Sequence, residues 1–286
     1  EIPVPTTLQK VSPALGINKI VMDRAGVYWF ATNGYGLLKW TPNKRKFQHF
    51  FPGKSFRQIK VTPNGGIFFM IDNLTIWEGG GFTTSRPNDW LTGLSDLLRW
   101  EYSVFEKDGN FWGLGSSADQ QCLLCRVDSQ TKKVVKYPKP CQLMGLLLSN
   151  NGNLLSISDD CALVSFNPQT GESTSTPFKK IEQRNIGSAF LMGTLYEDAQ
   201  GVVWIYHFPG LIKAIPDGKG WKFSYFQNNP HDRSSLSDNF ILSLQDDPIR
   251  PEQYLWVGTK GGGLNRLDKK TGKFRHFKTQ DGLPDN

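Results

Sequence analysis

The segment that decides the fold runs from Tyr254 to Asp268 and reads Tyr-Leu-Trp-Val-Gly-Thr-Lys-Gly-Gly-Gly-Leu-Asn-Arg-Leu-Asp. Bulky and β-branched residues predict strands over 255–259 and 264–267, and the glycines between them predict a tight turn. A second turn over 268–272 leads to a polar strand over 273–277, which suits an outer edge. The segment therefore predicts a meander of short antiparallel strands.

The same arrangement recurs along the chain. Six segments align on one large residue each, at spacings of 39, 44, 43, 49 and 52 residues. These anchor residues are Trp29, Phe68, Trp112, Leu155, Trp204 and Trp256. Burying each of them between neighbouring sheets is worth roughly 1.5–3 kcal/mol. A period of about 40 to 50 residues is typical of a four-stranded propeller blade.

Two more positions of the repeat predict a hairpin turn before the anchor residue. A glycine lies three residues ahead of it in five segments, at Gly26, Gly65, Gly109, Gly152 and Gly201. A short polar or acidic residue precedes that turn, and it is an aspartate at Asp23, Asp198 and Asp247. We interpret these aspartates as turn caps, because a carboxylate accepts backbone N–H groups while glycine supplies a positive φ. The sixth segment replaces the glycine turn with residues 248–253.

Composition and repeat together predict an all-β fold, a β-propeller of four-stranded antiparallel blades with six repeats visible. With 38% apolar side chains, 286 residues are enough for one propeller domain over residues 1–286. A β-sandwich would not repeat its turn chemistry at this period, and solenoid repeats are usually shorter. Six blades, seven blades and part of a longer array remain alternatives. The start at Glu1, without a methionine or signal peptide, indicates a processed product or an excised domain.

Charge and hydropathy narrow the classes of function. The longest apolar stretches, such as Met144–Leu148, are far shorter than the roughly 18 residues of a transmembrane helix. The net charge of +7 comes from scattered basic residues, as at Lys44–Lys46, which is expected of solvated strand edges. No basic stripe or recognition helix accompanies the charge, so we expect no nucleic-acid partner.

Four cysteines, Cys122, Cys125, Cys141 and Cys161, lie close together in the sequence. The first two resemble half of a zinc knuckle, but no second pair follows and no histidine is near, so we predict no metal and no cofactor. In a strand, residues three apart point to opposite faces, so one of this pair is expected to be a buried apolar filler. A disulfide to Cys141 or Cys161 is an alternative in an oxidising compartment, and the sequence does not choose the pairing.

The sixth segment resembles a known repeat. Residues 235–247, 254–268, 273–277 and 281–286 closely resemble the two-component regulator propeller repeat. Its usual form is an Asn-x-Val strand, an acidic turn, Leu-Trp-Ile-Gly-Thr, Gly-Gly-Leu-Asn-Arg and a closing Phe-x-x-Tyr. The first, third and fifth segments resemble it moderately, and the second and fourth only by spacing. The resemblance covers the chain from about Gly16 onward.

The resemblance implies the periplasmic sensor of a bacterial hybrid two-component system, commonly a receptor for oligosaccharides. No phospho-accepting histidine box, nucleotide-binding glycine box or receiver-type acidic cluster is found, so we expect the input part of the receptor and not an enzyme. A histidine kinase would then lie elsewhere in the full-length protein. The expected partners are a small-molecule or oligosaccharide ligand and further propeller, sandwich and kinase domains of the same receptor, and a homodimer is left open.

Propeller geometry favours a binding site on the face formed by the loops that enter the innermost strand and by the turns joining second and third strands. The candidate ligand-binding residues there are Asn33, Tyr35, Trp90, Trp100, Asp119, Asp159, His207, Phe208 and Lys260. Aromatic rings stack on the apolar faces of sugars, while amides and carboxylates bind the hydroxyls. Core packing for Trp100 and a turn role for Asp159 are the competing interpretations.

Two other classes of function remain as alternatives. A propeller lyase would need a histidine and a carboxylate converging on one face, and a glycosidase would need two carboxylates. Only His207 is predicted at a second-to-third strand turn, while His49, His231 and His276 are expected elsewhere, which argues against catalysis. A protein-interaction scaffold would instead present a broad apolar or basic face without a pocket.

Overall fold

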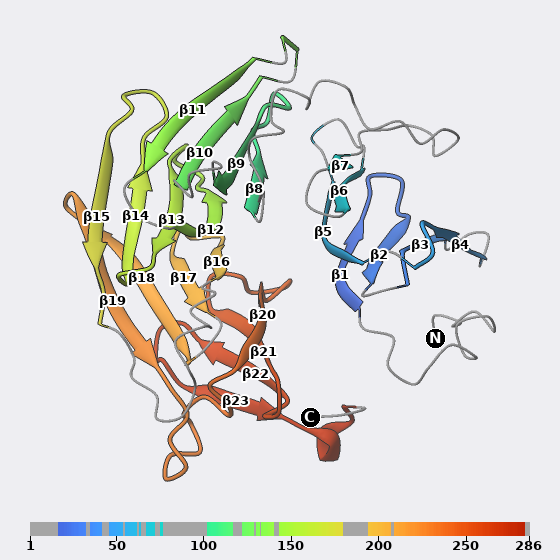
Figure 1. Ribbon diagram of the computed structural model, residues 1–286. Coiled ribbons are helices and arrows are strands. Elements are labelled where there is room, and N and C mark those ends of the chain that lie inside the picture. Colours follow the sequence, from blue (N-terminus) through green and yellow to red (C-terminus); the bar gives the residue numbers. More distant parts are fainter. Residues whose placement is uncertain are drawn as a thin grey trace. The chain divides into compact units, whose positions relative to one another are not determined.

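The computed structural model describes residues 17–32, 35–41, 46–53, 55–61, 63, 67–71, 75–76, 102–116, 122–128, 130–131, 133–139, 143–179, 194–206 and 209–283. Regular structure in these residues is almost entirely β-strand (Figure 1). The chain divides into two compact units, unit 1 (residues 1–139) and unit 2 (residues 140–286).

In its described residues, unit 1 contains three antiparallel sheets. The first consists of β1 (Ile17–Met22), β2 (Tyr28–Thr32), β3 (Leu37–Thr41) and β4 (Lys46–Phe50). The second consists of β5 (Phe56–Val61), β6 (Ile67–Ile71) and β7 (Thr75–Ile76). The third consists of β8 (Tyr102–Phe105), β9 (Phe111–Ser116), β10 (Cys122–Val127) and β11 (Val134–Lys139).

In the described residues of unit 2, three further sheets have four strands each. They are β12 (Leu143–Leu148), β13 (Leu154–Ser158), β14 (Ala162–Phe166) and β15 (Ser173–Pro177); β16 (Thr194–Glu197), β17 (Val203–Tyr206), β18 (Leu211–Asp217) and β19 (Gly220–Phe226); and β20 (Ile241–Asp246), β21 (Tyr254–Thr259), β22 (Leu264–Asp268) and β23 (Phe274–Phe277). A short 3-10 helix, η3 (Thr279–Asp281), follows the last strand.

Every four-stranded sheet is a meander in which each strand pairs with the next one along the chain, which is the topology of a propeller blade. The predicted strands over 255–259 and 264–267 lie within β21 and β22. In the first, third, fourth and fifth repeats the first turn closes as the glycine pattern predicts. The amide of Gly26 donates to the carbonyl of Asp23 over 3.0 Å, and that of Gly201 to Asp198 over 2.9 Å, with φ of +74° and +76° at the two glycines.

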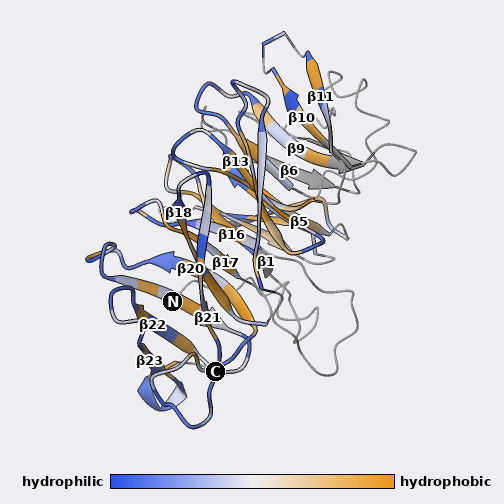
Figure 2. Ribbon diagram, turned by 90° about the vertical axis from the view of Figure 1, so that its left-hand side faces the viewer, coloured by the Kyte–Doolittle hydropathy of each residue, from blue (hydrophilic) through white to orange (hydrophobic). Residues whose placement is uncertain are grey.

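Alternating side chains of one strand fill two different cores. On β17, Val203 and Ile205 pack with Leu155 and residues of the β12–β15 blade, whereas Trp204 packs with Leu255 and residues of the β20–β23 blade. A blade with neighbours on both sides therefore has two apolar faces, and Figure 2 shows hydrophobic residues concentrated in the strands and hydrophilic residues in the connecting turns. For this reason apolar and polar residues alternate less strictly along these strands than along the strands of a sheet with one exposed face.

Neighbouring blades also meet strand to strand. In unit 2, β12 packs against β16 and β15 against β19, so first strands lie near first strands and fourth strands near fourth strands. In unit 1, β1 packs against β5 in the same way. This stacking of meanders face to face confirms the prediction of an all-β propeller fold.

The predicted number of four-stranded blades is wrong. The described residues form five four-stranded sheets, and the second repeat is a sheet of only three, β5–β6–β7, in which β7 has two residues. The residues that follow Ile76 up to residue 101 lie outside the described residues. The prediction of this repeat rests on Phe68, Gly65 and their spacing, and these do not fix the number of strands in a sheet.

Candidate functional site

Three of the nine candidate ligand-binding residues fall within the described residues, and all three lie in turns that join the second strand of a blade to the third. Tyr35 lies between β2 and β3 in unit 1, whereas Asp159 lies between β13 and β14, and Lys260 between β21 and β22, in unit 2. The other six lie outside the described residues and stay predictions: Asn33, Trp90, Trp100, Asp119, His207 and Phe208.

Asp159 and Lys260 occupy the same place in two blades. Each lies four residues after the anchor residue of its repeat, Leu155 or Trp256, and directly follows the second strand. Both side chains are exposed. Within the described residues, no hydrogen bond or ion pair engages the carboxylate of Asp159 or the amine of Lys260. Their charged groups are therefore available to solvent or to a ligand.

Lys260 also shows that two kinds of loop share one edge of the blade. Its amide donates to the carbonyl of Phe240 over 2.9 Å, and its amine lies 4.9 Å from the centre of the Phe240 ring. Phe240 directly precedes β20, the first strand of this blade. The second-to-third strand turn and the loop that enters the first strand therefore lie side by side, and they present a cation over an aromatic face.

Behind this edge, a buried amide holds the loop over 227–240. Asn265 on β22 is fully buried; its Oδ1 accepts the amide of Ser237 over 3.0 Å and its Nδ2 donates to the Ser237 hydroxyl over 2.7 Å. Asn239 accepts the amide of Asn228 over 2.6 Å, which is a structural role. Sequence reasoning did not single out Asn265, although an amide between two apolar positions of a strand was the available signal.

Two of the three described histidines, His49 and His276, contact backbone carbonyls. The Nε2 of His49 contacts the carbonyl of Tyr35, and that of His276 lies 2.6 Å from the carbonyl of Ser235. His231 is exposed in the loop that leads to β20. In the part of the chain that the structure describes, no ion pair joins a histidine to a carboxylate, while His207 lies outside it.

The repeated aspartates lie at the opposite end of the strands and serve the blade. In all three cases Oδ1 accepts two amides of the first turn, and Oδ2 accepts the indole N–H of the anchor tryptophan over 2.9 Å; the pairs are Asp23 with Trp29, Asp198 with Trp204, and Asp247 with Trp256. The amide of Arg250, with others, holds the pKa of Asp247 below its ordinary value. All three carboxylates therefore have hydrogen-bond partners within their own blade.

In the third repeat a glutamate replaces the aspartate. Trp112 Nε1 donates to Glu106 Oε1 over 2.5 Å, and Arg126 Nη2 lies 2.6 Å from Oε2. Burial raises the pKa of the Glu106 carboxyl, but the hydrogen bonds from Arg126 and Trp112 outweigh burial, so the pKa lies below its ordinary value. The turn cap passes to Asp108, whose Oδ1 accepts the amide of Asn110 over 3.0 Å.

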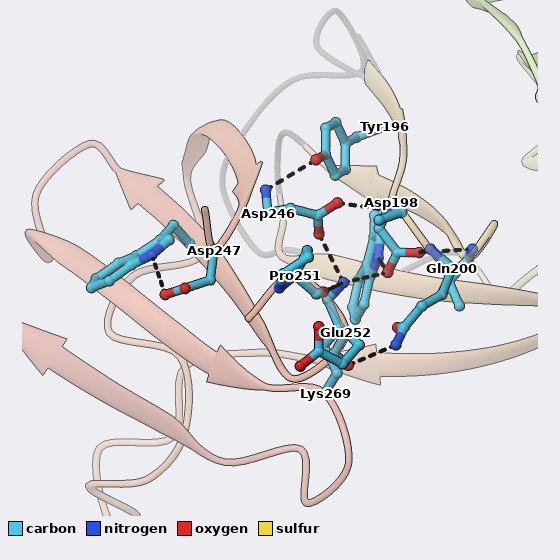
Figure 3. A network of polar contacts seen from close by, with 12 residues as sticks. Tyr196, Asp198, Gln200, Asp246, Asp247, Pro251, Glu252 and Lys269 are labelled. Atoms are coloured by element: carbon cyan, nitrogen blue, oxygen red, sulfur yellow. Dashed lines mark hydrogen bonds and ion pairs between the residues drawn. The ribbon is translucent and has the colours of Figure 1, made fainter. Parts of the chain in front are cut away.

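A buried lysine joins two blades of unit 2 at this end (Figure 3). The Lys269 side chain is 4% exposed; its Nζ lies 2.8 Å from Asp198 Oδ2, 2.8 Å from Asp246 Oδ1 and 2.7 Å from the carbonyl of Pro251. Burial raises the pKa of the nearby Tyr196, whose hydroxyl accepts the amide of Asp246, to about 12. This network fixes the seam between the β16–β19 and β20–β23 blades, and sequence reasoning missed it because its members are far apart in the chain.

Two of the four cysteines have described side chains, Cys125 and Cys161, and both are buried. Cys125 on β10 is fully buried, as expected of an apolar filler. Among the described residues, no group of three or more histidines, cysteines or carboxylates could hold a metal ion. The side chains of Cys122 and Cys141 lie outside the described residues.

No protein-family model and no curated protein matches this chain. Among solved structures, virginiamycin B lyase from Staphylococcus aureus matches with a TM-score of 0.63 and 12% identity, over 92% of this chain and 84% of the lyase. PorZ, a surface component of the type-IX secretion system of Porphyromonas gingivalis, matches with a TM-score of 0.65 and 13% identity, over 96% of this chain and 43% of PorZ. The β-propeller domain of Cps50 (Swd1) from Myceliophteria thermophila matches with a TM-score of 0.61 and 11% identity, over 93% of this chain and 86% of that domain.

Identities this low show the fold alone, which is the β-propeller. The extracellular domain of the putative one component system BT4673 from B. thetaiotaomicron also matches, with 17% identity over 92% of this chain and 41% of that domain. Its TM-score of 0.42 is too low to show a shared fold. Among the described residues, no helix has the length and apolar character needed to cross a membrane.

Proposed function

We propose that this chain is the ligand-sensing propeller of a hybrid two-component receptor. It acts outside the cytoplasm and binds an oligosaccharide at the edge that carries the second-to-third strand turns. The observation that supports this most is the contrast between two places in the repeat. Four of the six repeats keep a carboxylate and a tryptophan in the frame of the blade, whereas the place four residues after the anchor changes from blade to blade: Asn33, Asp72, Ser116, Asp159, Phe208 and Lys260.

A place that varies even among the four repeats that share the carboxylate and the tryptophan is free to serve something other than the blade. In the described residues, Asp159 and Lys260 at this place are exposed and their charges are unpaired. Carboxylate, amide, hydroxyl, aromatic and amine groups together match the mixed surface of a sugar, which has polar hydroxyls around apolar C–H faces.

The resemblance of the β20–β23 blade to the two-component regulator propeller repeat supports the class of receptor. Asp247 and Trp256, which belong to that motif, hold the blade together and so say nothing about the ligand. The kinase, the β-sandwich and further propellers would be supplied by other parts of the receptor.

The two alternative functions have weaker support. The folds of virginiamycin B lyase and PorZ are similar to this one, but identities of 12% and 13% carry no activity or partner over to this chain. A lyase would need a histidine beside a carboxylate, whereas His49 and His276 contact backbone carbonyls and His231 is exposed. A scaffold surface would not require varied polar residues at one place of each blade.

The proposal is tested by thermal unfolding of the chain in the presence of neutral and acidic oligosaccharides, followed by chromatography of the sugar. We expect at least one sugar to raise the melting temperature and to be recovered intact, because binding to the folded state alone stabilises it. Turnover of the sugar would indicate an enzyme instead, and no shift with any sugar would contradict the sensor.

Matched variants locate the site. Asp159→Asn and Lys260→Met are expected to reduce the ligand-induced shift, because both lie in second-to-third strand turns. Asp217→Asn and Lys270→Met change the same charges at exposed places beside third-to-fourth strand turns of unit 2, and should leave the shift unchanged. Equal effects of both pairs would contradict this location.

A further inference from the structure

Two side chains of opposite charge lie on neighbouring loops of the β20–β23 blade and do not pair with each other. Asp238 belongs to the loop that enters β20, and Lys260 to the turn between β21 and β22. Lys260 is exposed and Asp238 is partly exposed. Among the described residues, no ion pair joins the two side chains, and no hydrogen bond engages Asp238 Oδ2 or the amine of Lys260. Both charges are therefore open to a ligand.

The residue between the two charged groups is Phe240, which contacts both. Asp238 Oδ1 accepts the amide of Phe240 over 2.7 Å, which leaves Oδ2 free. The Lys260 amide donates to the Phe240 carbonyl over 2.9 Å, and its amine lies 4.9 Å from the centre of the Phe240 ring. The carboxylate and the ammonium group therefore belong to one small surface, although they are not close enough to form an ion pair.

The turn that carries Lys260 has no side chain beside the free carboxylate oxygen. A Cβ on the exposed Gly261 would lie 3.2 Å from Asp238 Oδ2, and a Cβ on Gly262 would collide with Ser237 and Asp238. Glycine allows another group to approach the backbone closely. Gly261 therefore leaves room for a ligand next to Oδ2.

Hydrogen bonds to the blade hold both loops in place. Ser237 is bonded to the buried Asn265 over 3.0 and 2.7 Å, and Thr259 donates to the carbonyl of Gly263 over 2.7 Å. Ser237 and Thr259 directly precede the two charged residues. A site that is ordered in this way loses little conformational entropy when a ligand binds.

We propose that Asp238 and Lys260 form a binding site for a neutral sugar, whose hydroxyls bridge the two charged groups. A carboxylate only accepts hydrogen bonds and an ammonium group only donates them, whereas a hydroxyl does both. Asp238 repels an anionic ligand and Lys260 a cationic one, so the pair favours a ligand without net charge. This inference rests on the proposed oligosaccharide function and adds the residue Asp238 and the class of sugar.

The first experiment measures affinities by isothermal titration for maltotriose, xylotriose and galactotriose, which are neutral, and for trigalacturonate, the acidic counterpart of galactotriose. We expect the tightest of the four to be neutral. Asp238→Asn keeps an Oδ1 acceptor for the Phe240 amide but removes the charge, and is expected to weaken binding of that sugar about tenfold or more. Tightest binding of trigalacturonate would overturn the proposal.

The single variants should change the charge preference in opposite directions. Asp238→Asn leaves the cation of Lys260, so the affinity for trigalacturonate relative to the neutral sugars is expected to rise. Lys260→Met leaves the anion of Asp238, so this ratio is expected to fall. Asp232→Asn removes the same charge from the same loop, at a place where Oδ1 accepts the amide of Ser234, and should leave the ratio unchanged. The same ratio in all four proteins would contradict the paired site.

The melting temperature without ligand separates a binding role from a structural one. Asp238→Asn keeps the hydrogen bond of the cap, so it is expected to melt as the wild type does. A clearly lower melting temperature would mean that the carboxylate supports the fold, and would contradict the proposal.

An arm with glycylglycine keeps the two proposals distinguishable. This dipeptide has no net charge, and its ammonium and carboxylate groups match Asp238 and Lys260. It is expected to raise the melting temperature of the wild type and of Asp232→Asn more than that of Asp238→Asn or Lys260→Met, whether or not any sugar binds. Such an effect without sugar binding would keep the paired site and contradict the oligosaccharide function. Sugar binding that is unaffected by Asp238→Asn would overturn the paired site and leave the sensor standing. Equal glycylglycine shifts in all four proteins, without sugar binding, would overturn both.

Discussion

At the scale of residues, four of the repeats build the same cluster around the anchor tryptophan. A carboxylate accepts the indole N–H, a cation from the third strand lies 5.0 to 5.9 Å from the ring centre, and an aromatic ring of the fourth strand lies 5.3 to 6.2 Å from it. The cations are Lys39, Arg126, Lys213 and Arg266, and the aromatic residues are Phe50, Tyr137, Phe226 and Phe277. The fourth repeat has Ser149, Leu155 and Ser165 instead. The cluster is thus kept or lost as a whole, because a buried carboxylate without its donors is unfavourable.

The hydrogen bond from the indole can be isolated by substitution with phenylalanine. Trp204→Phe removes the donor to the fully buried Asp198 and is expected to lower the free energy of unfolding by about 1.5–3 kcal/mol, in addition to lost packing. Trp256→Phe, at a half-buried place, should have a smaller effect. Trp221→Phe makes the same change on a partly buried ring, with no hydrogen bond from its indole among the described residues, and should be the mildest. Urea unfolding gives this order, and a Trp221→Phe effect equal to that of Trp204→Phe would contradict it.

The lowered pKa of Glu106 predicts a pH dependence. A carboxyl with a pKa lower in the folded chain than in the unfolded one stabilises the fold above its unfolded pKa, near 4.5, and loses this effect as the pH falls through the folded value. The difference in unfolding free energy between wild type and Glu106→Gln should therefore be largest above pH 4.5 and narrow below it. Asp217→Asn, which removes an exposed carboxylate, is measured beside it as the control for the loss of one negative charge. A Glu106→Gln difference independent of pH would be inconsistent with the pairing to Arg126.

Sequence analysis predicted one half of this cluster. The carboxylate at a fixed place before each turn was interpretable as a cap, because caps act within a few residues. The second role of the same carboxylate, as acceptor for the indole of Trp29, Trp204 or Trp256, depends on how the hairpin folds back. A clue was nevertheless present in the sequence, since Thr62 and Ser149 replace the carboxylate only where Phe68 and Leu155 replace the tryptophan.

At the scale of elements, the third strand of several blades begins after a glycine that no other residue could replace without strain. Gly36, Gly210 and Gly263 have φ of +85°, +133° and +77°, and each is followed by a leucine that opens the third strand. A Cβ at any of these glycines would collide with the last carbonyls of the fourth strand. Cys161 occupies the equivalent place before β14 with a φ of +65°. The sequence indicated a glycine turn here, but the close approach of the fourth strand is visible only in the structure.

Two glycine variants separate backbone strain from this collision. Gly171→Ala, at a φ of +75° with open space around it, is expected to lower the free energy of unfolding by about 1–2 kcal/mol. Gly263→Ala has a similar φ but would bring a methyl group against the carbonyl of Phe277, so its loss should be clearly larger. Chemical denaturation of both variants measures the difference. Equal losses would mean that β22 and β23 can move apart freely.

At the scale of the molecule, the sequence predicted the class of fold but not the blade count. Tryptophans and glycine turns act within one blade, so their pattern predicted strands such as β21 and β22. The second repeat lacks the tryptophan, and an anchor residue with its spacing does not fix the number of strands in a sheet. Contacts between blades could not be predicted from the sequence either, because their partners are 47 residues apart. Glu197 accepts the amide of Asn150 over 2.8 Å, and Asp246 accepts that of Ala199 over 2.8 Å. Both acids directly precede the cap position of their own blade.

The ion pairs of Lys269 between two blades predict how far the destabilisation caused by one substitution extends along the chain. Lys269→Met would leave Asp198 and Asp246 close together without their cation, and is expected to lower the free energy of unfolding by about 3–5 kcal/mol. Stacked repeats contact only their neighbours, so opening should stay local. Hydrogen exchange is expected to quicken in β16–β23, while β1–β4 of unit 1 exchange as in the wild type. Lys270→Met, which changes the exposed neighbour, should alter neither region. Faster exchange to the same degree in both units would show instead that the blades unfold as one cooperative body. The loss of unfolding free energy caused by Lys269→Met would then affect the whole chain.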